Sequence, residues 1–157
     1  MKTAQQWFDE YAESHQNPVN TAVHWICVPV IFYAIISLLA LIELPFSSGV
    51  LAERWLNVGS LVIVLGMVFY FSMSLTIALG MLLVSLGVLL LHQSLHAYFG
   101  SNLVWFNLLL FALAWVGQFI GHHIEGKKPS FLKDLQFLLV GPAWLLGKVY
   151  RTIGLSL

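Results

Sequence analysis

Seventy consecutive residues, from Trp55 to Ile124, contain no Asp, Glu, Lys or Arg. As one α-helix this stretch would be about 105 Å long, whereas a bilayer core is about 30 Å thick and takes about 20 helical residues. The stretch therefore folds back and crosses, or re-enters, more than once. Because backbone groups in lipid must be paired within the segment, we expect these crossings to be helices. Runs such as Leu61–Leu65 lack the alternation that a membrane β-barrel requires.

The composition of the whole chain supports the same assignment. Of its 157 residues 59% are hydrophobic and 9% are charged, whereas soluble domains carry about 25% charged residues. The formal net charge is zero, which argues against binding to nucleic acid. The single cysteine, Cys27, excludes an intrachain disulfide and a multi-cysteine metal site. We expect one membrane-embedded domain over residues 1–157.

The order of the segments predicts an all-α bundle with about four transmembrane helices. Thr3 is a suitable N-cap for an amphipathic interfacial helix over residues 3–15. The pair Asn17-Pro18 starts the first transmembrane helix, which extends to Leu44. A polar loop follows over 45–54, then three apolar segments at about 56–71, 75–91 and 103–121, and a fifth over 135–150. The fifth is split by Gly141-Pro142 and is predicted to be interfacial or half-inserted.

Four crossings place both ends of the chain on the same side of the membrane. That side then holds six of the seven basic residues, namely Lys2, Lys127, Lys128, Lys133, Lys148 and Arg151. Only Arg54 lies opposite. Because positively charged loops stay inside, we expect a multi-pass integral membrane protein with both termini in the cytoplasm.

Six histidines are unusual in so apolar a chain, and they fall into three pairs. Polar groups at membrane depth are candidates for function, although histidines at a helix end can simply hydrogen-bond water among the headgroups. The topology puts His15, His24 and His122 at one level on the cytoplasmic side. The pair His92 and His96 ends the third crossing on the opposite side. Its spacing suits a metal on a helix face, but we favour a solvated helix end.

Two polar residues share a helix face with His122. Gln118 lies four residues before it, and Glu125 three residues after it if the helix continues. Glu125 has two interpretations. It either balances Lys127 and Lys128 at headgroup level, or it serves as a metal ligand or orients a ligating imidazole.

Asn20 lies four residues before His24 and packs in the first helical turn or hydrogen-bonds a ligand. The three histidines and a carboxylate form a nitrogen and oxygen donor set without thiolates. Such a set suits non-haem Fe(II), Mn(II) or Zn(II).

Two spaced motifs resemble the signature of the fungal 2-hydroxy fatty acid dioxygenases and their bacterial and plant relatives. The similarity in order, spacing and hydropathy extends over nearly the whole chain. The motifs are Tyr11-x3-His15-x-Asn17-Pro18-x-Asn20-x3-His24-x4-Pro29 and Trp115-x2-Gln118-Phe119-x-Gly121-His122, the latter followed by Glu125-x3-Pro129.

The resemblance implies an iron(II)-dependent enzyme of fatty acid α-oxidation. Its substrates would be a 2-hydroxy fatty acid and O2, and its product the acid one carbon shorter. The Gly-His context favours His122 over His123 as the family's histidine. We therefore expect His15, His24 and His122 to bind Fe(II), with Asn20, Gln118 and Glu125 as catalytic candidates. The acyl chain would lie between the transmembrane helices.

Two other functions fit the same residues. The first is electron transfer by a b-type haem, with two of the three histidines as axial ligands. The second is non-catalytic lipid binding, with interfacial histidines and no metal. A serine hydrolase is disfavoured because no G-x-S-x-G motif occurs.

Overall fold

The computed structural model describes residues 2–45, 55–129 and 136–157. Within these ranges the chain is all-helical, as predicted. Its elements are α1 (Ala4–Ala12), α2 (Pro18–Ala40), α4 (Val58–Met73), α5 (Leu75–Phe99), the short 3-10 helix η1 (Gly100–Asn102), α6 (Leu103–Glu125) and α7 (Phe137–Thr152). Nearly all of the predicted polar loop 45–54, together with Arg54 and Lys133, lies outside the described residues.

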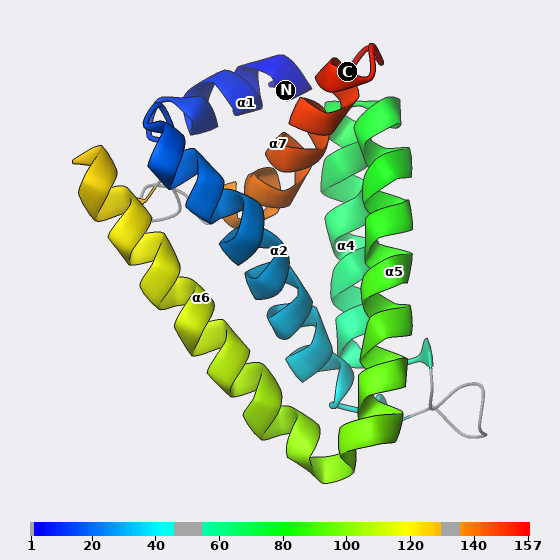
Figure 1. The fold of residues 1–157 in the computed structure, drawn as a ribbon. Coiled ribbons are helices and arrows are strands. Elements are labelled where there is room, and N and C mark those ends of the chain that lie inside the picture. Colours follow the sequence, from blue (N-terminus) through cyan, green and yellow to red (C-terminus); the bar gives the residue numbers. More distant parts are fainter. Residues whose placement is uncertain (1, 46–54, 130–135) are drawn as a thin grey trace.

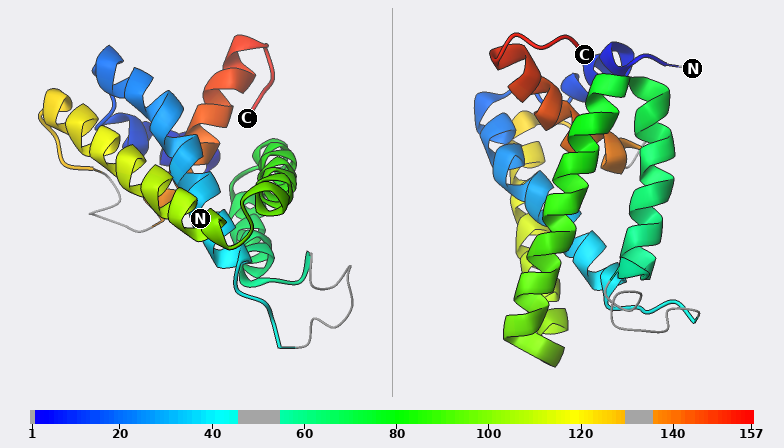
Figure 2. Two further views of the ribbon diagram at one scale, coloured as in Figure 1. Left: turned by 60° about the horizontal axis from the view of Figure 1, so that its bottom comes forward. Right: turned by 90° about the vertical axis from the view of Figure 1, so that its right-hand side faces the viewer.

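The helices are arranged so that both termini lie at one end of the molecule (Figure 1). Helices α2 and α6 lie side by side, and α4 and α5 form a second pair. At the far end η1 turns the chain from α5 into α6 (Figure 2), where Gly100 adopts a φ of 53°. Helix α1 lies across the near end and packs on α7. The three long helices α2, α5 and α6 thus run between the end that holds both termini, called the polar end below, and the opposite end.

The helix starts follow the predicted capping signals. The Thr3 side chain accepts a hydrogen bond from the Gln6 backbone N–H, and the Gln6 side chain accepts one from the Thr3 backbone N–H. The two bonds complete a capping box. The Asn17 side chain accepts from the Val19 backbone N–H at 2.9 Å, and Pro18 is the first helical residue of α2. The Asn17 cap ends the short connection between α1 and α2, which carries His15.

Several predicted helix ends were wrong. Helix α1 ends at Ala12 and α2 at Ala40, before the predicted residue 15 and Leu44, whereas α5 runs to Phe99, eight residues beyond its predicted end. Helix α6 continues past residue 121 to Glu125, the extension that places Glu125 on the face of His122. Helix α7 is continuous through Pro142 and is not split there. A proline removes one intrahelical hydrogen bond, and the burial of Val140, Ala143 and Trp144 around it holds the helix together.

Two helical stretches are long and apolar enough to cross a membrane, Pro18–Ala40 and Leu75–Glu125. The second stretch is bent at η1 and consists of α5 and α6. Helix α4 is also apolar but has only 16 residues.

A pair of glycines lets α6 approach α2 closely. A Cβ atom on Gly117 would lie 2.6 Å from the Cys27 Sγ, and one on Gly121 would lie 2.5 Å from the Asn20 Oδ1. Gly117 and Gly121 are four residues apart, the small-residue spacing by which membrane helices bring their backbones together. We call this close contact of Gly117 and Gly121 with α2 the glycine seam. It ends one residue before His122 and therefore sets how near His122 comes to α2.

We expect Gly121→Ala to destabilise the protein by about 1–3 kcal/mol, the usual cost of overpacking a tight contact. The fully buried Asn20 side chain stands where the new methyl group would lie. The measurement is thermal unfolding in detergent. The matched control is Gly87→Ala in α5, where a Cβ meets nothing within 4 Å. Equal melting temperatures for the two variants would contradict the close contact.

Candidate metal centre

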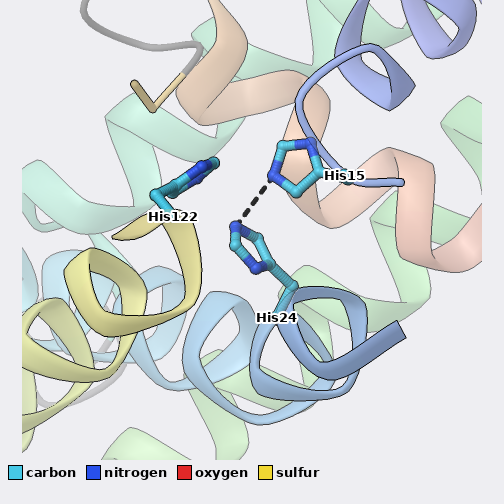
Figure 3. A group of neighbouring side chains, drawn as sticks. All are labelled: His15, His24 and His122. Atoms are coloured by element: carbon cyan, nitrogen blue, oxygen red, sulfur yellow. Dashed lines mark hydrogen bonds between the residues drawn. The ribbon is translucent and has the colours of Figure 1, made fainter. Parts of the chain in front are cut away.

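Three histidines from distant parts of the sequence converge at the polar end of the bundle (Figure 3). His15 follows α1, His24 lies near the start of α2, and His122 lies in the last turn of α6. One ligand nitrogen from each ring lies within 4.8 Å of the others. All three side chains are buried, with exposures of 4%, 1% and 4%. The predicted convergence of these imidazoles is therefore seen in the structure, and the three rings can hold a metal ion.

The hydrogen bonds of His15 and His24 fix which ring nitrogen carries the proton. The Nδ1 of His15 faces the Tyr11 carbonyl oxygen, and the Nδ1 of His24 lies 2.8 Å from the Asn20 carbonyl oxygen. A carbonyl oxygen only accepts, so both Nδ1 atoms donate and both Nε2 atoms carry lone pairs. These two Nε2 atoms lie 2.8 Å apart. Two buried lone pairs at this distance repel each other unless a cation or a proton lies between them.

His122 and Gln118 complete this arrangement from α6. The Nδ1 of His122 is buried and has no hydrogen-bond partner in the part of the chain that the structure describes. Gln118, one turn earlier, is buried and interacts through its side chain with His24. The neighbouring His123 is exposed, so the structure agrees with the choice of His122 over His123.

Aromatic side chains cover the His15 side of the cluster. The Tyr11 ring stacks on His15 with centroids 4.1 Å apart, and the Trp144 ring of α7 lies 5.4 Å from it. This burial, together with the neighbouring His24, lowers the pKa of His15 to about 3. The imidazole is therefore neutral at physiological pH, the form that a metal ion requires.

Glu125 holds the segment that carries His15. Its two carboxylate oxygens accept hydrogen bonds from the backbone N–H groups of Gln16 and Asn17, at 2.9 and 2.8 Å. The Asn20 side chain also donates to Glu125, at 3.1 Å. The carboxylate therefore holds the backbone beside His15, which is closer to the predicted orienting role than to a charge balance, and it is not among the described groups that lie close enough together to hold a metal ion. Lys127, predicted as a possible charge partner, instead donates to the Glu13 carbonyl oxygen.

Asn20 is fully buried between α2 and α6. Besides Glu125, its amide nitrogen donates to the Ser14 carbonyl oxygen at 3.0 Å, and its Oδ1 points towards Gly121. These contacts connect the chain before His15 to the end of α6. They favour a positioning role in this first turn over direct contact with a ligand.

The prediction of a solvated helix end holds for His96, which is exposed, and is wrong for His92, which is buried. The Ser37 hydroxyl lies 2.8 Å from the His92 Nδ1, and the Asn107 amide donates to that hydroxyl at 2.7 Å. Ser37 is 13 residues beyond His24, or about 20 Å along α2. His92 therefore belongs to a separate polar cluster and is too distant to join the three histidines.

A pocket with mostly apolar walls extends from the cluster into the bundle. His24 and His122 form its polar end, with Gln118 beside them. The rest of its wall comes from α1, α2, α6 and α7: Tyr11, Val28, Ile31, Phe32, Ile35, Trp115, Phe137, Leu138, Gly141 and Pro142.

Sequence reasoning assigned no role to several residues that shape this site. Trp144 lies far along the chain, and only tertiary packing brings it to His15. Gly117 and Gly121 do carry a signal, the spacing of small residues in an apolar segment. That spacing alone could have predicted the close contact beside His122.

We expect His15→Ala, His24→Ala and His122→Ala each to abolish metal retention, because each removes one of three buried donors. Metal content per protein after purification and dialysis is the measurement. His123→Ala and His96→Ala, which remove exposed rings, should leave it unchanged. Retention of metal by all three buried variants would contradict the centre.

We expect Glu125→Ala to weaken metal affinity by about 10–100-fold, the usual effect of losing a group that orients a ligand. The substitution leaves the histidines in place but removes the acceptor of three hydrogen bonds around His15. A competition titration with a chelator measures the affinity. Glu13→Ala, which removes an exposed carboxylate nearby, controls for the change in charge and should bind as the wild type does.

Comparisons with known proteins agree with this architecture. The family described as 2-hydroxy-palmitic acid dioxygenase Mpo1-like matches residues 1–153. The 2-hydroxy-palmitic acid dioxygenase MPO1 of Saccharomyces cerevisiae is 27% identical over 148 residues, which cover 92% of this chain and 78% of the yeast protein. No solved structure matches the chain. The predicted resemblance is confirmed, and the chain belongs to the Mpo1-like family of 2-hydroxy-palmitic acid dioxygenases.

Proposed function

We propose that this protein is an iron(II)-dependent dioxygenase that converts 2-hydroxy fatty acids and O2 into fatty acids one carbon shorter. The observation that carries the proposal is an apolar pocket that ends on three converging imidazoles. The printed name of the yeast relative supports the substrate class. The pocket suits an acyl chain and the imidazoles suit a metal, so the two ends of such a substrate have complementary surroundings.

The residues fit a metal ion in two respects. The facing Nε2 atoms of His15 and His24 leave a place for a cation or a proton, and the buried Nδ1 of His122 has no hydrogen-bond partner among the described residues. Three imidazoles leave further coordination positions open. Bound Fe(II) supplies the one-electron chemistry that O2 requires, which Zn(II) does not. The protein holds the imidazoles neutral and oriented through the carbonyl oxygens of Tyr11 and Asn20.

The distance between two of the rings argues against one form of the haem alternative, with His15 and His24 as the two axial ligands. Axial nitrogens on opposite faces of a haem lie about 4 Å apart, because each metal–nitrogen bond is about 2 Å long. The Nε2 atoms of His15 and His24 lie only 2.8 Å apart. A porphyrin ring between them would require both helical segments to separate.

The substrate is proposed to bind with its polar end at the histidines. Gln118, whose amide is beside His24, is the candidate that hydrogen-bonds the 2-hydroxyl or carboxylate oxygens. On its other side His122 lines a shallow surface depression with Lys127 and Lys128, which suits the passage of an anionic headgroup. Asn20 and Glu125 act as positioning residues through the segment that carries His15.

The proposed reaction balances without an external reductant. The bond between C1 and C2 breaks, C2 becomes the new carboxyl carbon, and C1 leaves at the oxidation level of carbon dioxide. The substrate loses four electrons and O2 accepts four. One fatty acid and one equivalent each of carbon dioxide and water account for all atoms.

We further propose that α2, α4, α5 and α6 cross the bilayer and that both termini are cytoplasmic. Apolar side chains are exposed along these helices, as expected of surfaces that face lipid. Among them are Ile26, Val64, Leu65, Val68, Leu79, Leu83, Leu90, Leu109, Leu113 and Val116. The metal centre would then lie at the level of the cytoplasmic headgroups, where a fatty acid carries its carboxylate.

The decisive experiment is an incubation of the purified protein with 2-hydroxypalmitate, O2 and Fe(II), followed by mass spectrometry. We expect pentadecanoate to form, no product under argon, and no product when Zn(II) replaces Fe(II). A Soret band in the purified protein would support the haem alternative, and a metal-free protein that binds the lipid unchanged would support lipid binding. Either result, without pentadecanoate, would overturn the proposal.

A further inference from the structure

The pocket wall contributed by α2 is a single stripe of side chains that begins at the metal centre. Val28, Ile31, Phe32 and Ile35 follow His24 at spacings of four, seven, eight and eleven residues. These spacings place all five on one face of the helix. The stripe therefore runs along the helix axis from His24 at the polar end to Ile35.

The positions along this stripe translate into distances from the histidines. With a rise of about 1.5 Å per residue, Val28 lies about 6 Å from His24, Ile31 about 10.5 Å and Ile35 about 16.5 Å. An extended acyl chain of carbon–carbon bonds of about 1.5 Å advances about 1.25 Å per carbon. Val28 is therefore level with about the fifth carbon, Ile31 with about the eighth, and Ile35 with about the thirteenth.

The far part of the pocket has an apolar wall. Ile31 is buried in an apolar cluster with Cys27 and Ala114, against which Ile35 and Trp115 pack. Beyond the level of Gln118 this wall presents no charged side chain among the described lining residues. Near the middle Gly141 presents no side chain, and a Cβ there would lie 3.5 Å from Val28.

We propose that the α2 stripe from Val28 to Ile35 lines the substrate's acyl chain, with the carboxyl end at the histidines, and that Ile35 sets the affinity for chains long enough to reach it, of about 13 carbons or more. The proposal rests on the proposed function, because it takes the acid's polar end to be at the metal centre. A 16-carbon chain would extend two or three carbons beyond Ile35. Each methylene buried there strengthens binding by about fourfold, so a change at Ile35 should alter binding of long chains and spare short ones.

The test compares 2-hydroxyoctanoate with 2-hydroxypalmitate in variants of the stripe. We expect Ile35→Trp to lower kcat/KM for the 16-carbon acid at least tenfold and to leave the eight-carbon acid within about twofold. Ile35→Ala, which removes the apolar contact at this level, should also weaken the 16-carbon acid and spare the eight-carbon acid. Val28→Phe, close to the centre, should weaken both substrates. Ile26→Trp on the outer face of α2, where Ile26 is 69% exposed, is the matched control and should change neither.

A second readout separates this proposal from the proposed function. Calorimetric titration of both acids under argon measures binding without turnover, and thermal unfolding verifies that each variant is folded. If the affinities follow this pattern but the wild type turns over no acid, the role of Ile35 in chain-length selection is supported and the dioxygenase is overturned. A different outcome is that the wild type turns over the acids while both Ile35 variants change kcat/KM equally for the two acids, or for neither. That result would overturn the role of Ile35 in chain-length selection and retain the dioxygenase. If Ile35→Trp does not fold, Ile35→Ala alone decides between these outcomes.

Discussion

The pairing of α2 with α6 is the contact on which the candidate metal centre depends. The two helices come from opposite parts of the chain, and the glycine seam at Gly117 and Gly121 lets them approach closely. His24 and His122 stand beside this seam. A wider crossing would separate the two rings, and no local change of rotamer could restore the contact. The third ligand candidate, His15, is then added by the short segment between α1 and α2.

The carboxylate of Glu125 connects this segment to the helix pair. A negative charge near the centre would be costly without partners, and here two backbone N–H groups and the Asn20 amide supply them. The charge therefore holds the backbone beside His15 and leaves the three imidazoles as the candidate metal donors. The aromatic rings of Tyr11 and Trp144 exclude water from His15. His15 and His24 are thus oriented by carbonyl oxygens, and His15 is uncharged, before any ligand arrives.

Much of this arrangement could be predicted from the sequence because it depends on local signals. Capping residues located the starts of α1 and α2, and the count of apolar segments put His15, His24 and His122 at one level. The failures have a physical cause as well. The burial of His92 depends on Ser37 and Asn107, which are 55 residues before it and 15 after it in sequence. Hydropathy does not encode such cross-helix hydrogen bonds, nor the tertiary packing that carries α7 through Pro142 and sets Trp144 beside His15.

The hydrogen bond between Asn107 and Ser37 has a consequence for how the protein responds to its surroundings. It joins α6 to α2 at the far end of the pair, while the bond between Asn20 and Glu125 joins them at the near end. These two hydrogen bonds lie about 25 Å apart along α2 and oppose sliding or rotation of α2 against α6. If α2 and α6 cross the bilayer as proposed, a change in bilayer thickness then tilts the two helices as one unit, together with α5, whose His92 contacts the same Ser37 hydroxyl. The distances between the imidazoles would thereby be insulated from the composition of the membrane.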